Sequence, residues 1–407
     1  MRDLTQQMRD AGEATIEDWQ IPKVEAELAW ALSQGFNGTT YGRRAARGRR
    51  TSPLPSARMS DFIDRYIGLC RSRGVLDFDL LLSEAITILR DERPALASFR
   101  HRNRSIFVDE TQDMNPLQFT LLRYMAGEDP VLFCVGDPNQ SIYGFNGASP
   151  ELLNELIATW PNTQVLDLTR NHRSTANIVA VADTLLDEGA AGITPAKPDG
   201  DVPLVRAYDS EKDECRAVAA WLHSKRQPGT PWRAMAVLAR TNQQLLAIAE
   251  TLTEMDIPFE RRGADYSPAS DVIQGDVGPA HWFDRDEVDA VALSTIHRSK
   301  GLEWQCVAVM GCAEGLLPHS GATTPEGVDE ERRLAYVAFT RAEDSLLMTW
   351  NRGLDVAGAP PRRASRFLEP INAVINRLNE SHAPLTGDAR RAKLAALRQQ
   401  LGGSAEN

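Results

Sequence analysis

Hydrophobic side chains recur at two different spacings along the chain, and the spacing changes near residue 105. Before that point they recur every three or four residues, as at Val24, Leu28 and Leu32. This spacing gathers the apolar side chains on one face of a helix. We therefore predict that residues 1–104 are mostly helical.

After residue 105, short continuous apolar runs alternate with amphipathic stretches of helical spacing. Apolar runs separated by helices are typical of parallel sheets whose two faces are covered. The pattern predicts an α/β fold, in which ligands bind at the carboxyl ends of the strands. The predicted strands lie at residues 106–108, 131–135, 165–168, 204–207, 234–239, 291–293, 307–310 and 346–349.

The length of 407 residues exceeds what one hydrophobic core usually spans, so we expect two sheet domains. Stretches rich in Gly and Pro at 188–203, 263–279 and 353–361 are candidate linkers. The expected division is a helical region at 1–104, the remainder of a first sheet domain at 105–170, a second sheet domain at 171–352, and helices with a flexible tail at 353–407.

The composition narrows the class of protein. Hydrophobic residues make up 42% and charged residues 25%, which argues against a disordered or fibrous chain. The net charge of −11 argues against a broadly basic nucleic-acid coat protein, although it leaves room for a local basic groove. No apolar run reaches the roughly 20 residues that cross a bilayer, and no cleavable signal opens the chain. We expect no membrane association.

The five cysteines have no CxxC spacing, so we interpret them as buried thiols rather than metal ligands. Unpaired thiols favour a reducing compartment, the cytoplasm. A basic run at residues 43–50 has two interpretations that the sequence leaves open. It is either a mobile, solvated loop or a grip on a phosphate backbone.

The first cluster of candidate chemistry is Asp109-Glu110, directly after the predicted strand at 106–108. One carboxylate at a strand end can hold Mg²⁺ while the other orients an attacking water. A solvated helix start would have the same two residues. This cluster alone therefore does not decide between the two interpretations.

Four further clusters follow in order along the chain. The first is Gly-Asp-Pro-Asn-Gln-Ser-Ile-Tyr-Gly-Phe at 136–145, and the second is Asn-His-Arg-Ser at 171–174. Ser-Thr-Ile-His-Arg-Ser-Lys-Gly-Leu-Glu-Trp at 294–304 and a segment at 330–342 that ends in Thr-Arg-Ala complete the set. A glutamine after a strand can contact a phosphate through its side-chain amide. Exposed aromatic rings can stack on bases.

With these clusters in this order, the chain resembles the UvrD/Rep/PcrA helicases of superfamily 1, from about residue 71 to residue 350. The resemblance implies two RecA-like domains with ATP in the cleft between them. It also implies ATP-driven 3′→5′ movement along single-stranded DNA, in repair or replication. ATP and Mg²⁺ are the implied cofactors, and single-stranded DNA is the implied partner.

Roles in catalysis follow from the resemblance, position by position. Asp109 would hold Mg²⁺ and Glu110 would be the general base for the hydrolytic water. Gln140 would contact the γ-phosphate, while Arg173 and Arg341 would act as arginine fingers. The two arginines have a simpler interpretation as surface ion pairs, which contribute under about 1 kcal/mol.

Roles in binding follow in the same way. The implied nucleotide contacts are His172, Gly301 and Glu303, with His172 standing where the family usually has a tyrosine stacked on adenine. The implied DNA contacts are Tyr143, Phe145, Asn146, Thr295 and His297. Phe145 stands where the family often has a tryptophan, and Asn146 replaces an arginine. Tyr143 and Phe145 could instead be core aromatics, and His172 a packed polar residue.

One family element has no counterpart in the sequence. The phosphate-binding loop GxxxxGK[ST] needs a lysine after glycine, and none of the six lysines follows one. The loop's amide nest and its lysine are therefore missing, and the first domain is expected to be incomplete. A sheet without that strand and helix should show an unpaired edge and uncovered apolar surface. In addition, only residues 261–289 remain where larger members insert an accessory subdomain.

Three hypotheses follow. The chain is the body of a helicase whose amino-terminal segment is missing, and it is weak or inactive alone. Alternatively, it is a catalytically inactive helicase-like protein that binds single-stranded DNA. Finally, it is a regulatory subunit, or the receiver of a second chain that supplies or covers the missing first-domain segment.

Overall fold

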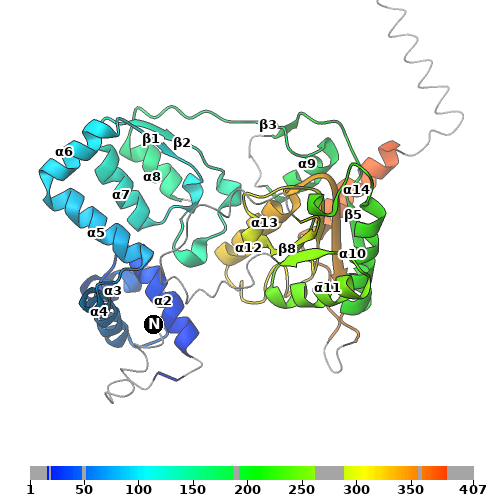
Figure 1. Ribbon diagram of the computed structural model, residues 1–407, viewed down its shortest axis with the longest axis horizontal. Coiled ribbons are helices and arrows are strands. Elements are labelled where there is room, and N and C mark those ends of the chain that lie inside the picture. The colour runs from blue at the N-terminus through cyan, green and yellow to red at the C-terminus, as the bar shows by residue number, and fades with distance from the viewer. Residues whose placement is uncertain are drawn as a thin grey trace, which may run out of the picture.

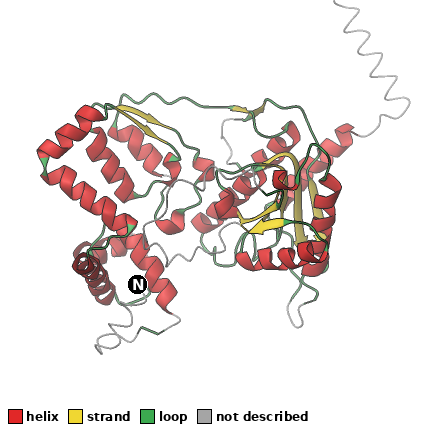
Figure 2. Cartoon of the chain, viewed as in Figure 1, coloured by secondary structure: helices red, strands yellow, loops and turns green. Residues whose placement is uncertain are grey.

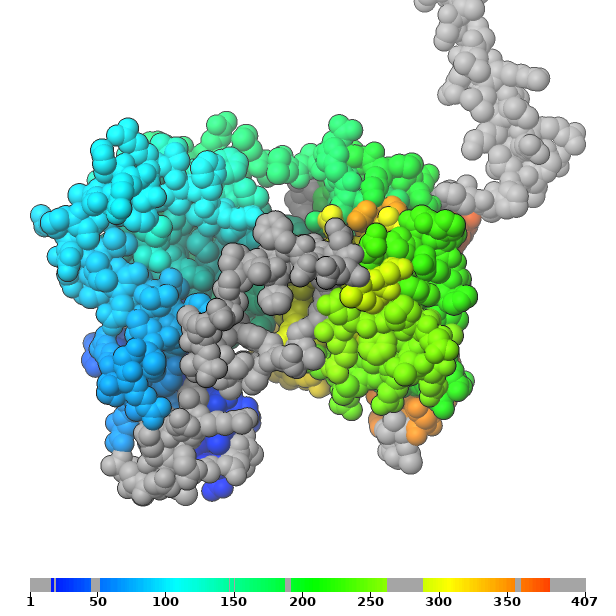
Figure 3. Space-filling model, in the orientation of Figure 1, coloured from blue at the N-terminus to red at the C-terminus, as the bar shows by residue number. Residues whose placement is uncertain are grey.

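The computed structural model describes residues 16–17, 20–47, 52–149, 151–186, 192–261, 288–355 and 360–382. Figure 1 shows two bodies, one built from α2 to α8 with β1 and β2, the other from β3 to α14. The space-filling view shows the same two bodies lying side by side (Figure 3). The predicted linker at 263–279 lies outside the described residues.

Helices dominate the amino-terminal region wherever it is described, as predicted. They are α2 (Ile21–Ser33), α3 (Gly38–Arg47), α4 (Ser56–Arg73), α5 (Phe78–Asp91) and α6 (Arg93–Arg102). Val24 and Leu28 of α2 pack with Phe62 and Ile63 of α4 in one buried cluster. The Asp77 carboxylate caps α5 by accepting the Leu80 N–H at 2.7 Å, which satisfies one free donor of the first turn.

Residues 43–47 of the basic run belong to α3, so the interpretation of the run as a mobile loop is wrong for these residues. Tertiary packing explains the difference. The Gly38 N–H donates to Oδ1 of Asp64 in α4 at 2.8 Å, and a Cβ at Gly38 would lie 2.2 Å from the Ser60 carbonyl oxygen. Glycine thus lets α3 approach α4 closely enough to be held as a helix.

The first sheet has two parallel strands, β1 (Ser105–Val108) and β2 (Val131–Cys134). One face packs through Ile106, Val108 and Leu132 against α7 (Pro116–Ala126) and α8 (Glu151–Thr159). The other face carries Phe107 and Phe133, which are 77% and 57% exposed. The uncovered apolar surface predicted from the sequence is therefore present.

The predicted strand at 165–168 does not form. Residues 163–169 have no regular structure, and they run between the two bodies (Figure 1). Val165, Leu166 and Leu168 are exposed there. A strand needs a neighbour to take up its backbone hydrogen bonds, and no described strand pairs with this segment. The prediction of a strand at 165–168 was wrong.

The second sheet has six strands in the order β5-β10-β9-β6-β8-β7, all of whose pairings are parallel. Figure 2 shows it as the larger group of yellow strands. The strands are β5 (Leu204–Tyr208), β6 (Met235–Ala239), β7 (Phe259–Arg261), β8 (Val291–Thr295), β9 (Trp304–Val309) and β10 (Ala342–Asn351). A short pair, β3 (Arg170–Asn171) and β4 (Thr194–Pro195), lies outside it.

Helices cover both faces of this second sheet. Val237 of β6 is buried against α10 (Glu211–Lys225) and α11 (Asn242–Glu254), while Leu238 is buried on the opposite face. Burying each such side chain contributes about 1.5–3 kcal/mol. The opposite face is covered by α9 (Ala176–Ala182), α12 (Ile296–Ser299), α13 (Pro325–Phe339) and α14 (Leu368–His382). The predicted α/β class with parallel sheets is confirmed, whereas the exact domain boundaries stay predictions.

Candidate functional site

The carboxyl ends of β1 and β2 form an acidic edge on the first body. Asp109 and Glu110 follow β1 and are exposed. Glu110 has a left-handed backbone, with φ at 51°, which is uncommon for a non-glycine residue and clusters at functional sites. The Asp109 carboxylate accepts the Glu110 N–H at 2.9 Å, which fixes the turn.

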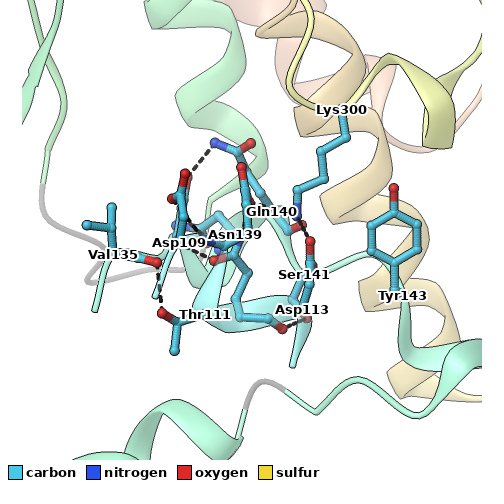
Figure 4. Close-up of polar contacts among 12 residues, drawn as sticks. Asp109, Thr111, Asp113, Val135, Asn139, Gln140, Ser141, Tyr143 and Lys300 are labelled. Atoms are coloured by element: carbon cyan, nitrogen blue, oxygen red, sulfur yellow. Dashed lines mark hydrogen bonds and ion pairs between the residues drawn. The ribbon is translucent and has the colours of Figure 1, made fainter. Parts of the chain in front are cut away.

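Gln112 ties the ends of the two strands together. Its Nε2 donates to Oε2 of Glu110 at 2.6 Å, and its Oε1 accepts the Asp137 N–H at 2.9 Å. Asp137 in turn accepts a hydrogen bond from Nε2 of Gln140 at 2.9 Å. Glu110 and Gln140 are therefore held at one edge by a continuous chain of hydrogen bonds, part of which Figure 4 shows.

The second body contributes two arginines to the same place. Nη2 of Arg341 donates to Oε1 of Gln140 at 3.3 Å. Arg341 is 1% exposed, and its burial, together with the charge of Arg173, lowers its pKa to about 10. It stays protonated at neutral pH and points a buried positive charge at Gln140. It is not one of the surface ion pairs considered as the alternative.

Arg173 is held differently. Its Nε lies 2.5 Å from Oε2 of Glu303, and both side chains are partly exposed. The predicted arginine finger Arg173 and the predicted nucleotide contact Glu303 thus pair with each other within the second body. His172 is exposed beside them. Gly301 follows Lys300 with φ at +78°, a conformation that favours glycine.

Lys300 is a residue that the sequence reasoning missed. It lies after α12, and its Nζ is 2.6 Å from Oδ2 of Asp113 and 2.6 Å from the Gln140 carbonyl oxygen. Oε2 of Glu110 is 3.4 Å away. Figure 4 shows the side chain reaching from the second body to this cluster. The available signal was a lone lysine beside Gly301, in a chain with few lysines.

Three rings meet at the other end of the Gln140 segment. The Tyr143 hydroxyl donates to the His297 carbonyl oxygen at 3.0 Å, and the centroids of Phe145 and His297 are 5.7 Å apart. Phe145 is 55% exposed, so its ring is open to a ligand, whereas Tyr143 is half-buried. Burial and the charge of Arg240 lower the pKa of His297 to about 4, so its imidazole is neutral at pH 7.

The remaining predicted DNA contacts are placed less fully. Thr295 ends β8, directly before the helix that carries His297. Asn146 closes a short 3-10 turn (Gly144–Asn146), and its side chain lies outside what the structure describes. The Gly144 N–H donates to Oε1 of Glu330 in α13 at 3.0 Å, so the second body also holds the backbone of this turn.

The carboxylates and arginines gathered here fit one part of a nucleotide site, the part that holds Mg²⁺ and neutralises phosphate charge. A carboxylate at a strand end, such as Asp109, suits Mg²⁺, which keeps several waters and binds through one or two carboxylates. Among the described residues no group of three or more His, Cys, Asp or Glu side chains is arranged as a metal cage. Arginines opposite suit developing phosphate charge. The glycine-lysine loop that would cradle the other phosphates is missing from the sequence.

Comparisons with known proteins identify the family of the chain. A family model described as the UvrD/REP helicase N-terminal domain matches residues 2–161. A model of the UvrD-like helicase C-terminal domain matches residues 166–264 and 281–353. The chain therefore belongs to the UvrD/REP helicase family, and its two parallel-sheet bodies are RecA-like domains.

Among individual relatives, the chain is 30% identical to the ATP-dependent DNA helicase UvrD2 of Mycobacterium tuberculosis, in an alignment of 467 positions, gaps included, that covers 94% of this chain. It is 31% identical to DNA helicase II of Escherichia coli over 202 residues, or 49% of this chain. The chain covers 66% of the first relative's length and 28% of the second's. No described helix is long and apolar enough to span a membrane.

Proposed function

We propose that this chain is the motor body of an ATP-dependent 3′→5′ DNA helicase that moves on single-stranded DNA. The contact between Gln140 and Arg341 carries the proposal, because it brings a strand-end glutamine of one body to a buried arginine of the other. Phosphoryl transfer is catalysed mainly by such positioned charges. DNA repair or replication in the cytoplasm is the proposed setting.

The proposed roles follow the geometry. Asp109 holds Mg²⁺, Glu110 activates water, and Gln140 contacts the γ-phosphate. Arg341 neutralises the developing charge, and Arg173 does so after its pairing with Glu303 is exchanged for phosphate. In the same arrangement Glu303 turns to the nucleotide sugar, with His172 and Gly301 beside the base.

Single-stranded DNA is proposed to cross the aromatic group of Tyr143, Phe145 and His297. The rings lie 5.7–6.4 Å apart by their centroids, and Phe145 faces solvent. Base stacking on such rings tolerates any sequence. Asn146 and Thr295 flank this group in the sequence and are proposed to contact the backbone of the strand.

ATP turnover by these 407 residues alone is proposed to be weak. Each charge-assisted bond of a phosphate-binding loop contributes about 1.5–3 kcal/mol, and several are missing at once. We propose that a second polypeptide supplies this loop. DNA-stimulated ATP hydrolysis by the isolated chain, abolished by Glu110→Gln, would contradict the weak turnover but establish the enzyme.

A second candidate function rests on the same missing loop. The chain could be a helicase-like protein that binds single-stranded DNA through Phe145 without hydrolysing ATP. Binding of an oligonucleotide that does not change on adding ATP, in the presence or absence of a phosphate-loop polypeptide, would favour it. Oligonucleotide unwinding by the completed complex would exclude it.

A further inference from the structure

The turn that carries Phe145 is capped from the other body of the molecule. It is a single 3-10 turn, Gly144–Asn146, and its N-cap residue Tyr143 makes no side-chain cap. A turn this short has poor hydrogen-bond geometry, and its first N–H has no partner within the turn. The Glu330 carboxylate supplies that partner, because its Oε1 accepts the Gly144 N–H at 3.0 Å. The cap of this first-body turn thus comes from α13 of the second body.

A second side chain of α13 holds the same segment of the first body. Nε of Arg333, one helical turn after Glu330, donates to the Ser141 carbonyl oxygen at 2.7 Å. Just after α13 ends, Arg341 donates to the side chain of Gln140 at the start of the segment. One helix and the residue that follows it therefore contact this segment at three points, from the acidic edge to the turn below the aromatic group.

The residue type at position 144 matches the contact with Glu330. A Cβ at Gly144 would lie 2.7 Å from Oε2 of Glu330, so any side chain there would push the carboxylate away. Burial raises the pKa of the half-buried Glu330, and the hydrogen bond from Gly144 opposes that rise. The carboxylate has therefore lost part of its hydration, and the Gly144 N–H compensates for this loss.

The other end of the turn is fixed by the first body. Nε2 of Gln34 in α2 donates to the Gly147 carbonyl oxygen at 3.3 Å. The Phe145 ring between these two contacts is 55% exposed, so packing around the ring does not fix its direction. The backbone contacts at Gly144 and Gly147 therefore set where the ring stands relative to His297.

We propose that Glu330 is a positioning residue for the stacking of DNA bases on Phe145, and that Arg333 supports it. This inference rests on the proposed function, because it needs single-stranded DNA at Phe145. Glu330 acts through the backbone of the turn and not by touching the DNA. Because Glu330 belongs to the second domain, separation of the two domains releases the turn and weakens base stacking.

A double-mutant cycle on oligonucleotide affinity tests this role in the full chain. Glu330→Ala should weaken binding of a labelled single-stranded oligonucleotide about fivefold, which corresponds to the net contribution of one hydrogen bond. In the Phe145→Ala background the same change should have no effect, because no ring is left to position. An equal loss in both backgrounds would indicate a contribution to folding alone and would overturn the proposal.

Two further variants separate the hydrogen bond from the charge. Glu330→Gln keeps an acceptor oxygen and should retain the wild-type affinity within about twofold. Gly144→Ala should weaken binding as Glu330→Ala does, since its Cβ displaces the carboxylate from the other side of the contact. Wild-type affinity in both alanine variants would contradict the positioning role.

Asp329→Ala is the matched control on the same helix. It removes the neighbouring carboxylate, which is exposed and pairs with Arg332 of α13 at 3.6 Å. This variant should bind the oligonucleotide like the wild type. A loss as large as that of Glu330→Ala would show that the effect is not specific to the contact with Gly144, and would count against the proposal.

Amide hydrogen exchange and the wild-type affinity separate this inference from the proposed function. Without DNA, exchange at the Gly144 N–H should be faster in Glu330→Ala, because its acceptor is gone, and unchanged exchange would overturn the cap itself. Tight oligonucleotide binding that does not depend on Glu330 would overturn the positioning role alone. No binding by the wild type would overturn the proposed DNA track and the role of Glu330 together.

Discussion

Nζ of Lys300 lies 2.6 Å from Oδ2 of Asp113, and the two residues belong to different bodies of the molecule. The Lys300 side chain is 6% exposed and that of Asp113 is 19% exposed. Burial raises the pKa of Asp113, and Lys300 opposes that rise. The pair therefore joins the two RecA-like domains at the acidic edge, and the positive charge of Lys300 favours the ionised form of Asp113.

We expect Lys300→Met to destabilise the protein by about 3 kcal/mol, because it leaves a partly buried carboxylate without its cation. Lys197→Met is the control, since Lys197 makes longer ion pairs with Glu343 and Asp344 at a more exposed site and should lose under about 1 kcal/mol. Urea unfolding measures both. Adding Asp113→Asn to Lys300→Met should recover part of the loss, and strict additivity of the two changes would contradict the coupling.

Phe145→Ala should weaken binding of single-stranded DNA by about 1–3 kcal/mol, because one base loses its stacking platform. Fluorescence anisotropy with a labelled oligonucleotide measures the affinity. Phe78→Ala removes an equally exposed ring from α5 and should leave the affinity unchanged. If both variants bind like the wild type, the aromatic group is not the DNA track.

His297 should stay neutral throughout the pH range 5.5–8, because burial and the charge of Arg240 lower its pKa to about 4. Replacing Arg240 with Met removes the second of these causes, so the pKa of His297 should rise. Arg240 also pairs with buried Glu331 at 2.7 Å, so the folded state of this variant must be verified first. Titration of the imidazole proton resonance by NMR measures the shift, and an unchanged midpoint would contradict the assignment.

Asp183 gives a stability prediction with a defined pH window. Burial raises its pKa to about 6, and its Oδ1 is buried without a hydrogen-bond partner. The folded state then holds a proton that the unfolded state releases near pH 4, so stability falls as pH rises from about 4 to 6. Asp183→Asn should therefore be more stable than wild type above about pH 6.

This advantage of Asp183→Asn should disappear below about pH 4, where the aspartate is protonated in both states. Thermal unfolding midpoints at pH 4, 5, 6 and 7 measure the difference. A constant difference across that series would show that Asp183 does not titrate in this window.

Local patterns in the sequence predicted much of the second domain. The apolar runs at 204–207, 234–239 and 291–293 all became strands, since each is fully able to pair with neighbours that the same chain provides. The motif residues were also recognisable, because phosphoryl transfer needs particular side chains at strand ends. The family assignment followed from those residues and is confirmed by the two family models.

The sequence by itself determined the α/β class, the family and the missing glycine-lysine loop, because these depend on residue types and local spacing. Only the tertiary structure decided that residues 43–47 are helical and that 165–168 is not a strand, since both depend on what lies alongside. It alone revealed Lys300 beside Asp113, because residues 187 positions apart meet only through packing. It also showed that the side chains of Phe107 and Phe133 are exposed, because none of the described helices packs on them.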